Sequence, residues 1–576
     1  MLNNLRRLGW ALSAAIALTV SACMPGPGET DYDVIIRGGN IYDGLGNDPF
    51  VADLGISGDR IAAIGNLSGY SGAIDIDAEN LAVAPGFINM LSWATESLIV
   101  DGRGLSDIKQ GVTLEVMGEG RSMGPLNETM KAEMRERQTN LRYEIEWTTL
   151  GEYLEFLENK GVSPNVASYV GATTIRVHEL GYEDRPPNAE ELARMQQLVR
   201  QAMREGALGV GSSLIYAPAN FADTDELIAL VAAAAESGGG YISHIRSEGN
   251  RLEEGVQELI KIASLTGAPA EIYHLKAAGK DNFHKLGNVF ELIEAARAAG
   301  LQITADMYNY TAGSTGLYAT MPLWVQEGGH DAWIARLKDP DIRARVVEEM
   351  KQPASDWENF YLGAGPENIL LVGFKNERLR PLTGKTLQEV ADERNADPAD
   401  TAIDLVIEDD SRVDAVYFFM SEDNVRKKLQ KSWISFGSDA GAVASEAPFT
   451  DVNPHPRAYG NFSRLLGKYV REEKLISLQE AIRRLTSLPA FNIGISERGE
   501  LTEGYFADIV VFDPERITDN ATFEEPHQYA TGVLHVFVNG EQVLRNGRHT
   551  GATPGRVVRG LGWEGWGVSS AGDARP

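Results

Sequence analysis

The chain has 576 residues, 43% of them hydrophobic, and it carries 53 basic against 82 acidic side chains. That length and apolar content suit one large domain with a smaller one beside it. The formal net charge of −29 repels phosphate backbones, so the composition argues against a nucleic-acid-binding protein.

The N-terminal segment has the pattern of an export signal and not of a folded element. Two arginines precede an apolar run over residues 8–20, which is too short for a permanent membrane span. The run ends in Val-Ser-Ala-Cys, which resembles a bacterial lipobox, so we expect residues 1–22 to be a signal peptide and Cys23 to be lipidated. An ordinary signal peptide with an incidental cysteine is the alternative. Residues 23–32 then form a tether, and the protein is expected in the periplasm of the bacterial cell envelope, with membrane contact only through its lipid anchor.

Two β-rich segments flank a long middle part of the chain. Residues 33–82 alternate into strands and a hairpin, and residues 496–560 again hold strands with tight turns. We expect these segments to combine into one small β-sandwich made from both chain ends. Residues 561–576 are expected to form a tail.

The middle part, residues 83–495, alternates strands with helical patterns, which is typical of parallel βαβ units. Two of the helical patterns cover residues 225–235 and 286–299. We therefore predict the α/β class and a (β/α)8 TIM-like barrel, with its active site at the carboxyl ends of the strands. An insertion is expected around residues 318–420. The eight predicted strands are 83–91, 112–118, 166–172, 208–215, 241–245, 270–276, 303–310 and 433–440.

Three metal-ligating side chains stand at the ends of predicted barrel strands. His244 ends the fifth strand, His274 the sixth and Asp439 the eighth. A single strand histidine is usually a hydrogen-bonded core residue, but in a barrel these three converge on one mouth. Nitrogen and oxygen ligands of this kind suit zinc.

Several segments that come in order along the chain carry a family resemblance. They include Ser243-His-Ile-Arg-Ser-Glu248, His274-Leu-Lys-Ala-Ala-Gly279 and Pro454-His-Pro-Arg457. From residue 33 to 560 the chain resembles the D-aminoacylases, the N-acyl-D-amino-acid deacylases of the amidohydrolase superfamily. The resemblance implies zinc-dependent hydrolysis of a small N-acyl amino acid or similar amide, with a carboxylate and a free D-amino acid as products.

Two departures from the family concern its metal site. The family has His-x-His at the end of the first strand, where this chain has Leu91 and Trp93, and a cysteine after the second strand, where this chain has Glu119. The resemblance implies that the lost pair served a weaker second metal position. Glu119, with the two strand-end histidines, is then expected to hold one zinc per chain. Glu115, which lies inside the second strand, is the alternative ligand.

The resemblance also implies roles for other residues. Asp439 is expected to be the catalytic base, and Arg457 to bind the α-carboxylate of the substrate, oriented by His455. Further expected substrate contacts are Lys276, Tyr310 and, as a donor to the developing oxyanion, Tyr216. Arg246 and Glu248 are expected to pair with each other as a structural clamp.

Two other functions remain open from the sequence. The same fold can act on another amide, a dipeptide or a cyclic amide. A different class of protein, a non-catalytic lipid-anchored binding protein with a degenerate site, is also compatible with the loss of His-x-His. The two strand-end histidines and Asp439 favour an enzyme, because a site without catalytic function has no physical reason to keep these three residues together.

Overall fold

The computed structural model describes residues 30–354 and 356–565 of the chain. The predicted signal peptide, Cys23 and most of the predicted tether lie outside these residues, as do residues 566–576 of the predicted tail. Within the described ranges, no helix has both the length and the apolar character needed to cross a bilayer.

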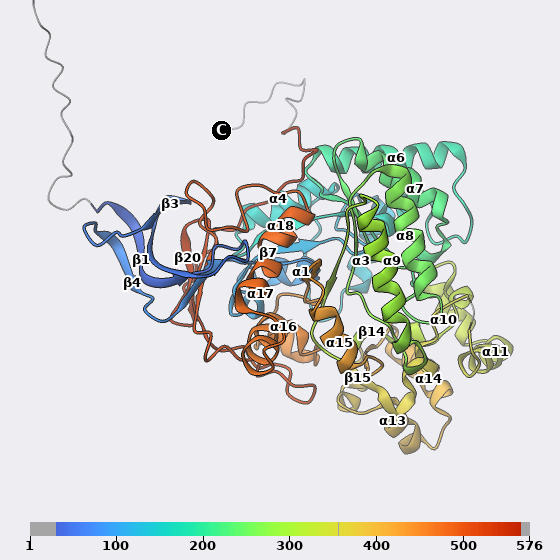
Figure 1. The fold of residues 1–576 in the computed structure, drawn as a ribbon. Helices are drawn as coiled ribbons and strands as arrows, with labels where there is room; N and C mark the ends of the chain where they lie inside the picture. Colours follow the sequence, from blue (N-terminus) through green and yellow to red (C-terminus); the bar gives the residue numbers. More distant parts are fainter. Residues whose placement is uncertain (1–29, 355, 566–576) are drawn as a thin grey trace, which may run out of the picture.

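Both chain ends contribute to one mixed sheet of nine strands, which lies at one end of the molecule (Figure 1). Its order is β21-β20-β19-β18-β5-β1-β2-β3, and β4 also pairs with β1. The two chain ends meet where β18 runs antiparallel to β5, with Ile509 opposite Pro85. Because β5 pairs on both of its edges, the hydrogen bonds make one continuous sheet and do not separate the two layers of the predicted sandwich. The strands are β1 (Tyr32–Ile41), β2 (Phe50–Ser57), β3 (Arg60–Gly65), β4 (Gly72–Asp77), β5 (Ala82–Pro85), β18 (Ile509–Phe512), β19 (Val533–Val538), β20 (Glu541–Arg545) and β21 (Arg548–His549).

The middle of the chain forms two parallel sheets, with the orders β17-β13-β12-β11-β10-β9 and β6-β7-β8. Only Tyr169 separates β8 from β9. At the opposite edges, Met90 N donates to Phe436 O at 3.1 Å, and Ser92 forms an isolated parallel bridge with Ala440. The fold is therefore parallel α/β, but no continuous ladder of the described strands closes the predicted barrel. The strands are β6 (Phe87–Asn89), β7 (Val112–Met117), β8 (Asn165–Ser168), β9 (Val170–Gly171), β10 (Gly209–Ser213), β11 (Gly240–His244), β12 (Ala270–Ile272), β13 (Ile303–Met307) and β17 (Ile434–Phe436).

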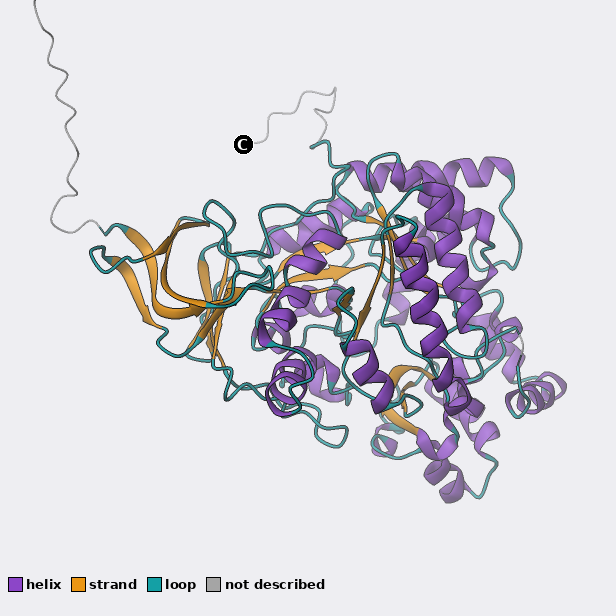
Figure 2. Cartoon of the chain, in the orientation of Figure 1, coloured by secondary structure: helices purple, strands orange, loops and turns teal. Residues whose placement is uncertain are grey.

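Helices cover the outer side of these strands (Figure 2). The helical patterns predicted over residues 225–235 and 286–299 are confirmed as α7 and α9. The first begins after Asp223, whose side chain accepts from Glu226 N, and its run of leucine and alanine favours a helix. The helices are α1 (Ala94–Val100), α2 (Leu105–Ile108), α3 (Glu128–Arg137), α4 (Leu150–Lys160), α5 (Ala172–Leu180), α6 (Ala189–Arg204), α7 (Thr224–Ala235), α8 (Leu252–Thr266), α9 (Leu286–Ala298), α15 (Glu422–Leu429), α16 (Arg457–Arg464), α17 (Leu478–Leu485) and α18 (Ser487–Asn492).

A smaller unit lies between β13 and β17 in the chain. Its three strands form an antiparallel sheet in the order β14-β16-β15. These strands and the helices beside them share an apolar cluster built around residues such as Ile369, Val390 and Tyr417. Its elements are β14 (Gly313–Gly316), α10 (His330–Leu337), α11 (Pro340–Met350), α12 (Phe360–Ala364), β15 (Ile369–Gly373), α13 (Leu387–Arg394), α14 (Pro398–Asp409) and β16 (Asp414–Tyr417).

Several parallel strands end earlier than the sequence predicts. The predicted strand 270–276 ends at Ile272, and the predicted strand 433–440 ends at Phe436. Just beyond these ends, His274 has φ 35° and Asp439 has φ 50°, a left-handed conformation that a strand does not contain. The backbone leaves the sheet at these residues and carries their side chains into the space above it.

Candidate metal centre

A glycine-flanked turn positions Glu119 directly after β7. Gly118 and Gly120 have φ 109° and 64°, which glycine adopts at little cost. The space is also restricted: a Cβ on Gly118 would lie 2.3 Å from Tyr169 O, and one on Gly120 would lie 2.0 Å from the hydroxyl of Ser213. Only glycine therefore fits on either side of Glu119. The turn points the carboxylate toward the ends of β11 and β12.

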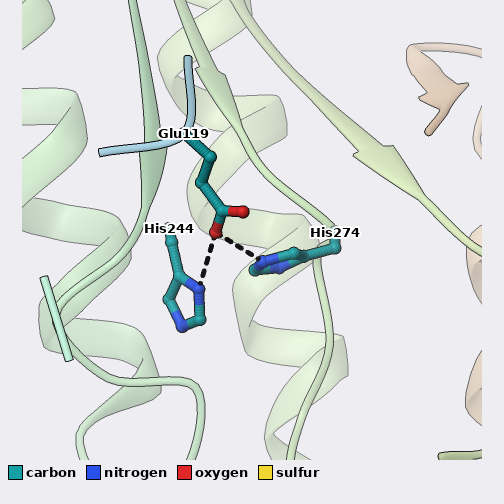
Figure 3. Close-up of side chains that lie close together, drawn as sticks. All are labelled: Glu119, His244 and His274. Carbon is teal, nitrogen blue, oxygen red and sulfur yellow. Dashed lines mark hydrogen bonds and ion pairs between the residues drawn. The ribbon is translucent and has the colours of Figure 1, made fainter. Parts of the chain in front are cut away.

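One carboxylate oxygen of Glu119 lies between two imidazoles (Figure 3). Its Oε1 is 3.0 Å from Nδ1 of His244 and 3.1 Å from Nε2 of His274. Among the described residues, these three side chains offer ligand atoms that all lie within 4.8 Å of one another, and all three are buried. An oxygen and two nitrogens in this arrangement fit a zinc ion with a coordination position left open.

A second carboxylate, that of Glu248, lies behind both imidazoles. Its Oε1 is 3.0 Å from Nδ1 of His274, and its Oε2 is 3.5 Å from Nε2 of His244. A carboxylate in this position orients metal-binding imidazoles. The predicted clamp between Arg246 and Glu248 is therefore wrong. The guanidinium of Arg246 turns outward and pairs with Glu258 at 2.9 Å, because Glu248 points inward to the cationic groups of the site.

The charges around the imidazoles favour a cation. Burial raises the pKa of Glu119, but hydrogen bonds from His244 and His274 outweigh it and hold that pKa well below its usual range. Burial likewise raises the pKa of Glu248, but His244 and Lys276 lower it further. Burial and Lys276 lower the pKa of His274, yet the carboxylates of Glu248 and Glu119 raise it to about 10. Two ionised carboxylates on either side of the imidazoles thus form a negative environment in which positive charge is stable.

The alternative ligand Glu115 lies in a different environment. It is fully buried within β7, and its Oε2 accepts from Asn89 Nδ2 at 2.9 Å. Burial raises its pKa to about 7. It does not belong to the group formed by Glu119 and the two histidines.

Asp439 lies beside this group, and its carboxylate contacts one hydrogen-bond donor and one cation. Its Oδ1 accepts from the indole Nε1 of Trp93 at 3.2 Å, and its Oδ2 is 2.9 Å from Nη1 of Arg457. Burial raises the pKa of Asp439, and Arg457 partly opposes that shift. A carboxylate with a raised pKa is a stronger base than a solvated one, which suits it to accept a proton.

A cavity of about 760 Å³ opens above these residues. Glu119, the two histidines and Asp439 line its inner end. Trp93 and Tyr216 also line it, and the ring of Tyr216 packs edge-on against His244 with 5.3 Å between ring centroids. The wall also holds an apolar stretch that contains Met123, Leu126, Met130, Met134 and Val177.

The predicted substrate contact of Tyr310 is not supported by its position. Tyr310 is buried outside the cavity lining, and its hydroxyl donates to Asp519 Oδ2 at 2.8 Å. Tyr308, two residues earlier, lines the cavity instead and lies under the guanidinium of Arg457, 4.5 Å from ring centroid to Cζ. The sequence prediction extended β13 to residue 310, whereas the strand ends at Met307 and the chain then turns away.

Lys276 and Arg457, which both line the cavity, have different partners. The ammonium of Lys276 donates to Glu248 Oε1 at 2.5 Å and lies 2.7 Å from Nδ1 of His274, so it holds the carboxylate that faces both imidazoles. Arg457 is buried, and its Nε has no hydrogen-bond partner among the described residues. An unsatisfied guanidinium N–H at a cavity wall is suited to a carboxylate ligand.

The imidazole of His455 positions the backbone of Arg457. Arg457 N donates to Nδ1 of His455 at 3.0 Å, so the other ring nitrogen carries the proton and donates to Ala312 O at 3.0 Å. Burial, together with the nearby guanidinium of Arg457, lowers the pKa of His455 well below its usual range. The imidazole is therefore neutral, and it fixes the turn from which α16 begins.

Comparisons with known proteins agree with this geometry. Residues 76–544 match the amidohydrolase family. The chain is 33% identical over 531 residues to a D-aminoacylase of Alcaligenes xylosoxydans xylosoxydans, in an alignment that covers 92% of this chain and 97% of that protein.

Two solved structures are similar over the same extent. One is an N-acyl-D-glutamate deacylase from Bordetella bronchiseptica, complexed with zinc and a phosphonate mimic of the tetrahedral intermediate; it has a TM-score of 0.76 and 30% identity, and the match covers 92% of this chain and 99% of that one. The other is a D-aminoacylase with a binuclear metal centre, described as activated by one metal and attenuated by the second; it has a TM-score of 0.75 and 32% identity, and the match covers 92% and 100%.

Proposed function

The chain belongs to the amidohydrolase family, and from that premise we propose that it is a zinc-dependent enzyme that hydrolyses N-acyl-D-amino acids. The products are a carboxylate and a free D-amino acid. The observation that carries this proposal is the convergence of Glu119, His244 and His274 beside Asp439 in one cavity. Two relatives that match over more than nine-tenths of the chain are a D-aminoacylase and an N-acyl-D-glutamate deacylase, and they supply the substrate class.

The three metal ligands would hold one zinc ion. When bound, zinc acidifies a water and polarises the scissile carbonyl. Asp439, with its raised pKa, accepts the proton from the attacking water and delivers it to the leaving amide nitrogen. Glu248 and Lys276 keep the imidazoles in place from behind.

The substrate carboxylate is assigned to Arg457. Its guanidinium is buried at the cavity wall and stacked on Tyr308, and His455 fixes the backbone turn that carries it. A carboxylate there forms charge-assisted hydrogen bonds in a site from which water is largely excluded. Tyr216, beside His244, is the neutral donor that we assign to the oxygen of the scissile carbonyl. The apolar wall beyond these groups would accept the acyl chain or an apolar side chain.

A direct experiment measures amine release by the zinc-loaded protein from matched N-acetyl-D- and N-acetyl-L-amino acids. We expect hydrolysis of the D series and little of the L series. The same assay with a dipeptide panel and a cyclic amide tests the two related activities. A zinc-loaded protein that hydrolyses none of these amides would contradict the enzymatic function.

The proposal also covers the architecture of the protein and its location in the cell. We infer that the two parallel sheets together make a (β/α)8 barrel, supported by the backbone contacts between residues 90–92 and 436–440. We infer also that the mixed sheet bends over its own apolar cluster as a small sandwich.

A lipid anchor at Cys23 would place the enzyme in the periplasm, and mass spectrometry of the purified N-terminus tests for the lipid.

A further inference from the structure

The indole of Trp93 connects two carboxylates of the site. Its Nε1 donates to Glu119 Oε2 at 2.9 Å and to Asp439 Oδ1 at 3.2 Å. The residue follows the end of β6, and it is 38% exposed at the cavity wall. A single N–H group therefore lies between the carboxylate that would bind the metal and the carboxylate that would act as the base.

The two oxygens of Glu119 have separate partners. Oε1 faces the imidazoles of His244 and His274, whereas Oε2 accepts from Trp93. The indole thus fixes the rotation of the carboxylate and directs one oxygen to the metal position. Removing a hydrogen-bond partner of a metal ligand typically lowers metal affinity or activity by about 10–100-fold.

The same indole reduces a repulsion. The carboxylates of Glu119 and Asp439 lie near each other, since one N–H group reaches an oxygen of each. Carboxylates that share a site need a proton, a cation or a donor between them. An indole has a donor and no acceptor, and it carries no charge, so Trp93 bridges the two groups without offering a metal ligand. Leu91, which is fully buried in an apolar cluster, offers none either.

We propose that Trp93 is a positioning residue whose indole N–H occupies the place of a second cation between Glu119 and Asp439, and that it restricts the site to one metal ion. The proposal rests on the proposed function for its effect on turnover. Its effect on metal binding does not depend on the substrate, so the two can fail separately.

The first test removes the N–H and keeps an aromatic ring. In Trp93→Phe we expect kcat to fall by about 10–100-fold with KM changed less than about threefold, and zinc affinity to fall in a competition assay with a chelator. Trp563→Phe is the matched control, since Trp563 lies outside the cavity lining and contacts Arg559. A Trp93→Phe protein with the zinc affinity and kcat of the parent would overturn the proposal.

The second test counts metal ions. With excess zinc, the parent is expected to bind one ion per chain in equilibrium dialysis followed by elemental analysis, and Trp93→His and Leu91→His/Trp93→His are expected to bind two. A second ion in the parent, or a single ion in folded Trp93→His, would overturn the proposal. The single variant decides the outcome where the double variant, which buries an additional imidazole, does not fold.

The two tests also separate this inference from the proposed function. A parent that binds one zinc and gains a second in Trp93→His, but hydrolyses no N-acyl amino acid, supports the role of Trp93 and contradicts the assigned reaction. A parent that hydrolyses N-acyl-D-amino acids with two bound ions keeps the reaction and contradicts the role of Trp93.

Discussion

Two sets of buried carboxylates in this protein behave in opposite ways. At the cavity, Glu119 and Glu248 have their pKa values held below the usual range. Within the parallel sheets, Glu115 and Glu271 have theirs raised to about 7. All four are buried, so burial alone does not decide the direction.

The partners decide it. The cavity carboxylates face imidazoles and, in the case of Glu248, the ammonium of Lys276. Glu271 accepts hydrogen bonds from the neutral side chains of Thr304, Ser435 and Asn492. The first set is therefore ionised and suited to hold a cation, whereas the second belongs to a hydrogen-bonded network between neighbouring strands that favours the protonated form. The same residue type thus serves the site and the sheets with its pKa shifted in opposite directions.

The largest expected effect on turnover comes from replacing Asp439, the proposed base beside Glu119. Asp439→Asn should lower kcat by about 10²- to 10⁴-fold, because an amide cannot accept the proton of the attacking water. Zinc content should remain that of the parent. In the parent, activity should be lost as the pH falls through the raised pKa of Asp439 and the carboxylate becomes protonated. A variant that turns over at the parental rate would remove Asp439 from the chemistry.

The carboxylate behind the imidazoles should have a smaller effect. Glu248→Gln removes the negative charge that orients His244 and His274, so zinc affinity should fall by about 10–100-fold. Glu258→Gln is the control, because Glu258 pairs with Arg246 on the outer side of the same loop. Equal zinc affinities in the two variants would show that Glu248 acts no differently from a carboxylate that does not contact the imidazoles.

The interior set should affect stability and not turnover. The pKa of Glu271 in the folded protein is about 7, above its ordinary value of 4.5. Between pH 4.5 and 7 the folded state therefore binds more protons than the unfolded state, so the free energy of unfolding falls as the pH rises through this range. Glu271→Gln should remove this loss, which is on the order of 1–3 kcal/mol. Thermal unfolding at pH 5 and pH 8, with a chelator present to remove zinc linkage, measures it. If the stability of variant and parent depended on pH in the same way, the raised pKa of Glu271 would be contradicted.

The sequence alone predicts much of this site and little of its surroundings. His244, His274 and Asp439 are predictable because their residue types stand at the ends of predicted strands, which meet at one edge of a parallel fold. Glu119 was predicted from the family resemblance, at the position of the family's cysteine. Tyr310 was assigned in place of Tyr308, because the residue at which β13 ends depends on packing that the local pattern does not contain.

Other contacts depend on tertiary structure in the same way. Glu248 stands four residues after His244, so its place in the motif was a signal, but only the path of the loop shows that it turns inward while Arg246 turns outward. The bridge made by the Trp93 indole and the pairing of β5 with β18 join distant parts of the chain, and neither leaves a periodic pattern in the sequence.

The comparison of the two carboxylate sets is tested most directly by zinc content per chain in the parent, Glu119→Gln and Glu115→Gln. Glu115 lies within β7 and Glu119 in the turn directly after it, and each variant replaces a carboxylate with an amide of the same shape. The account predicts about one zinc per chain in the parent and in Glu115→Gln, and a large loss in Glu119→Gln. A parent without bound zinc, or a loss in Glu115→Gln but not in Glu119→Gln, would contradict it.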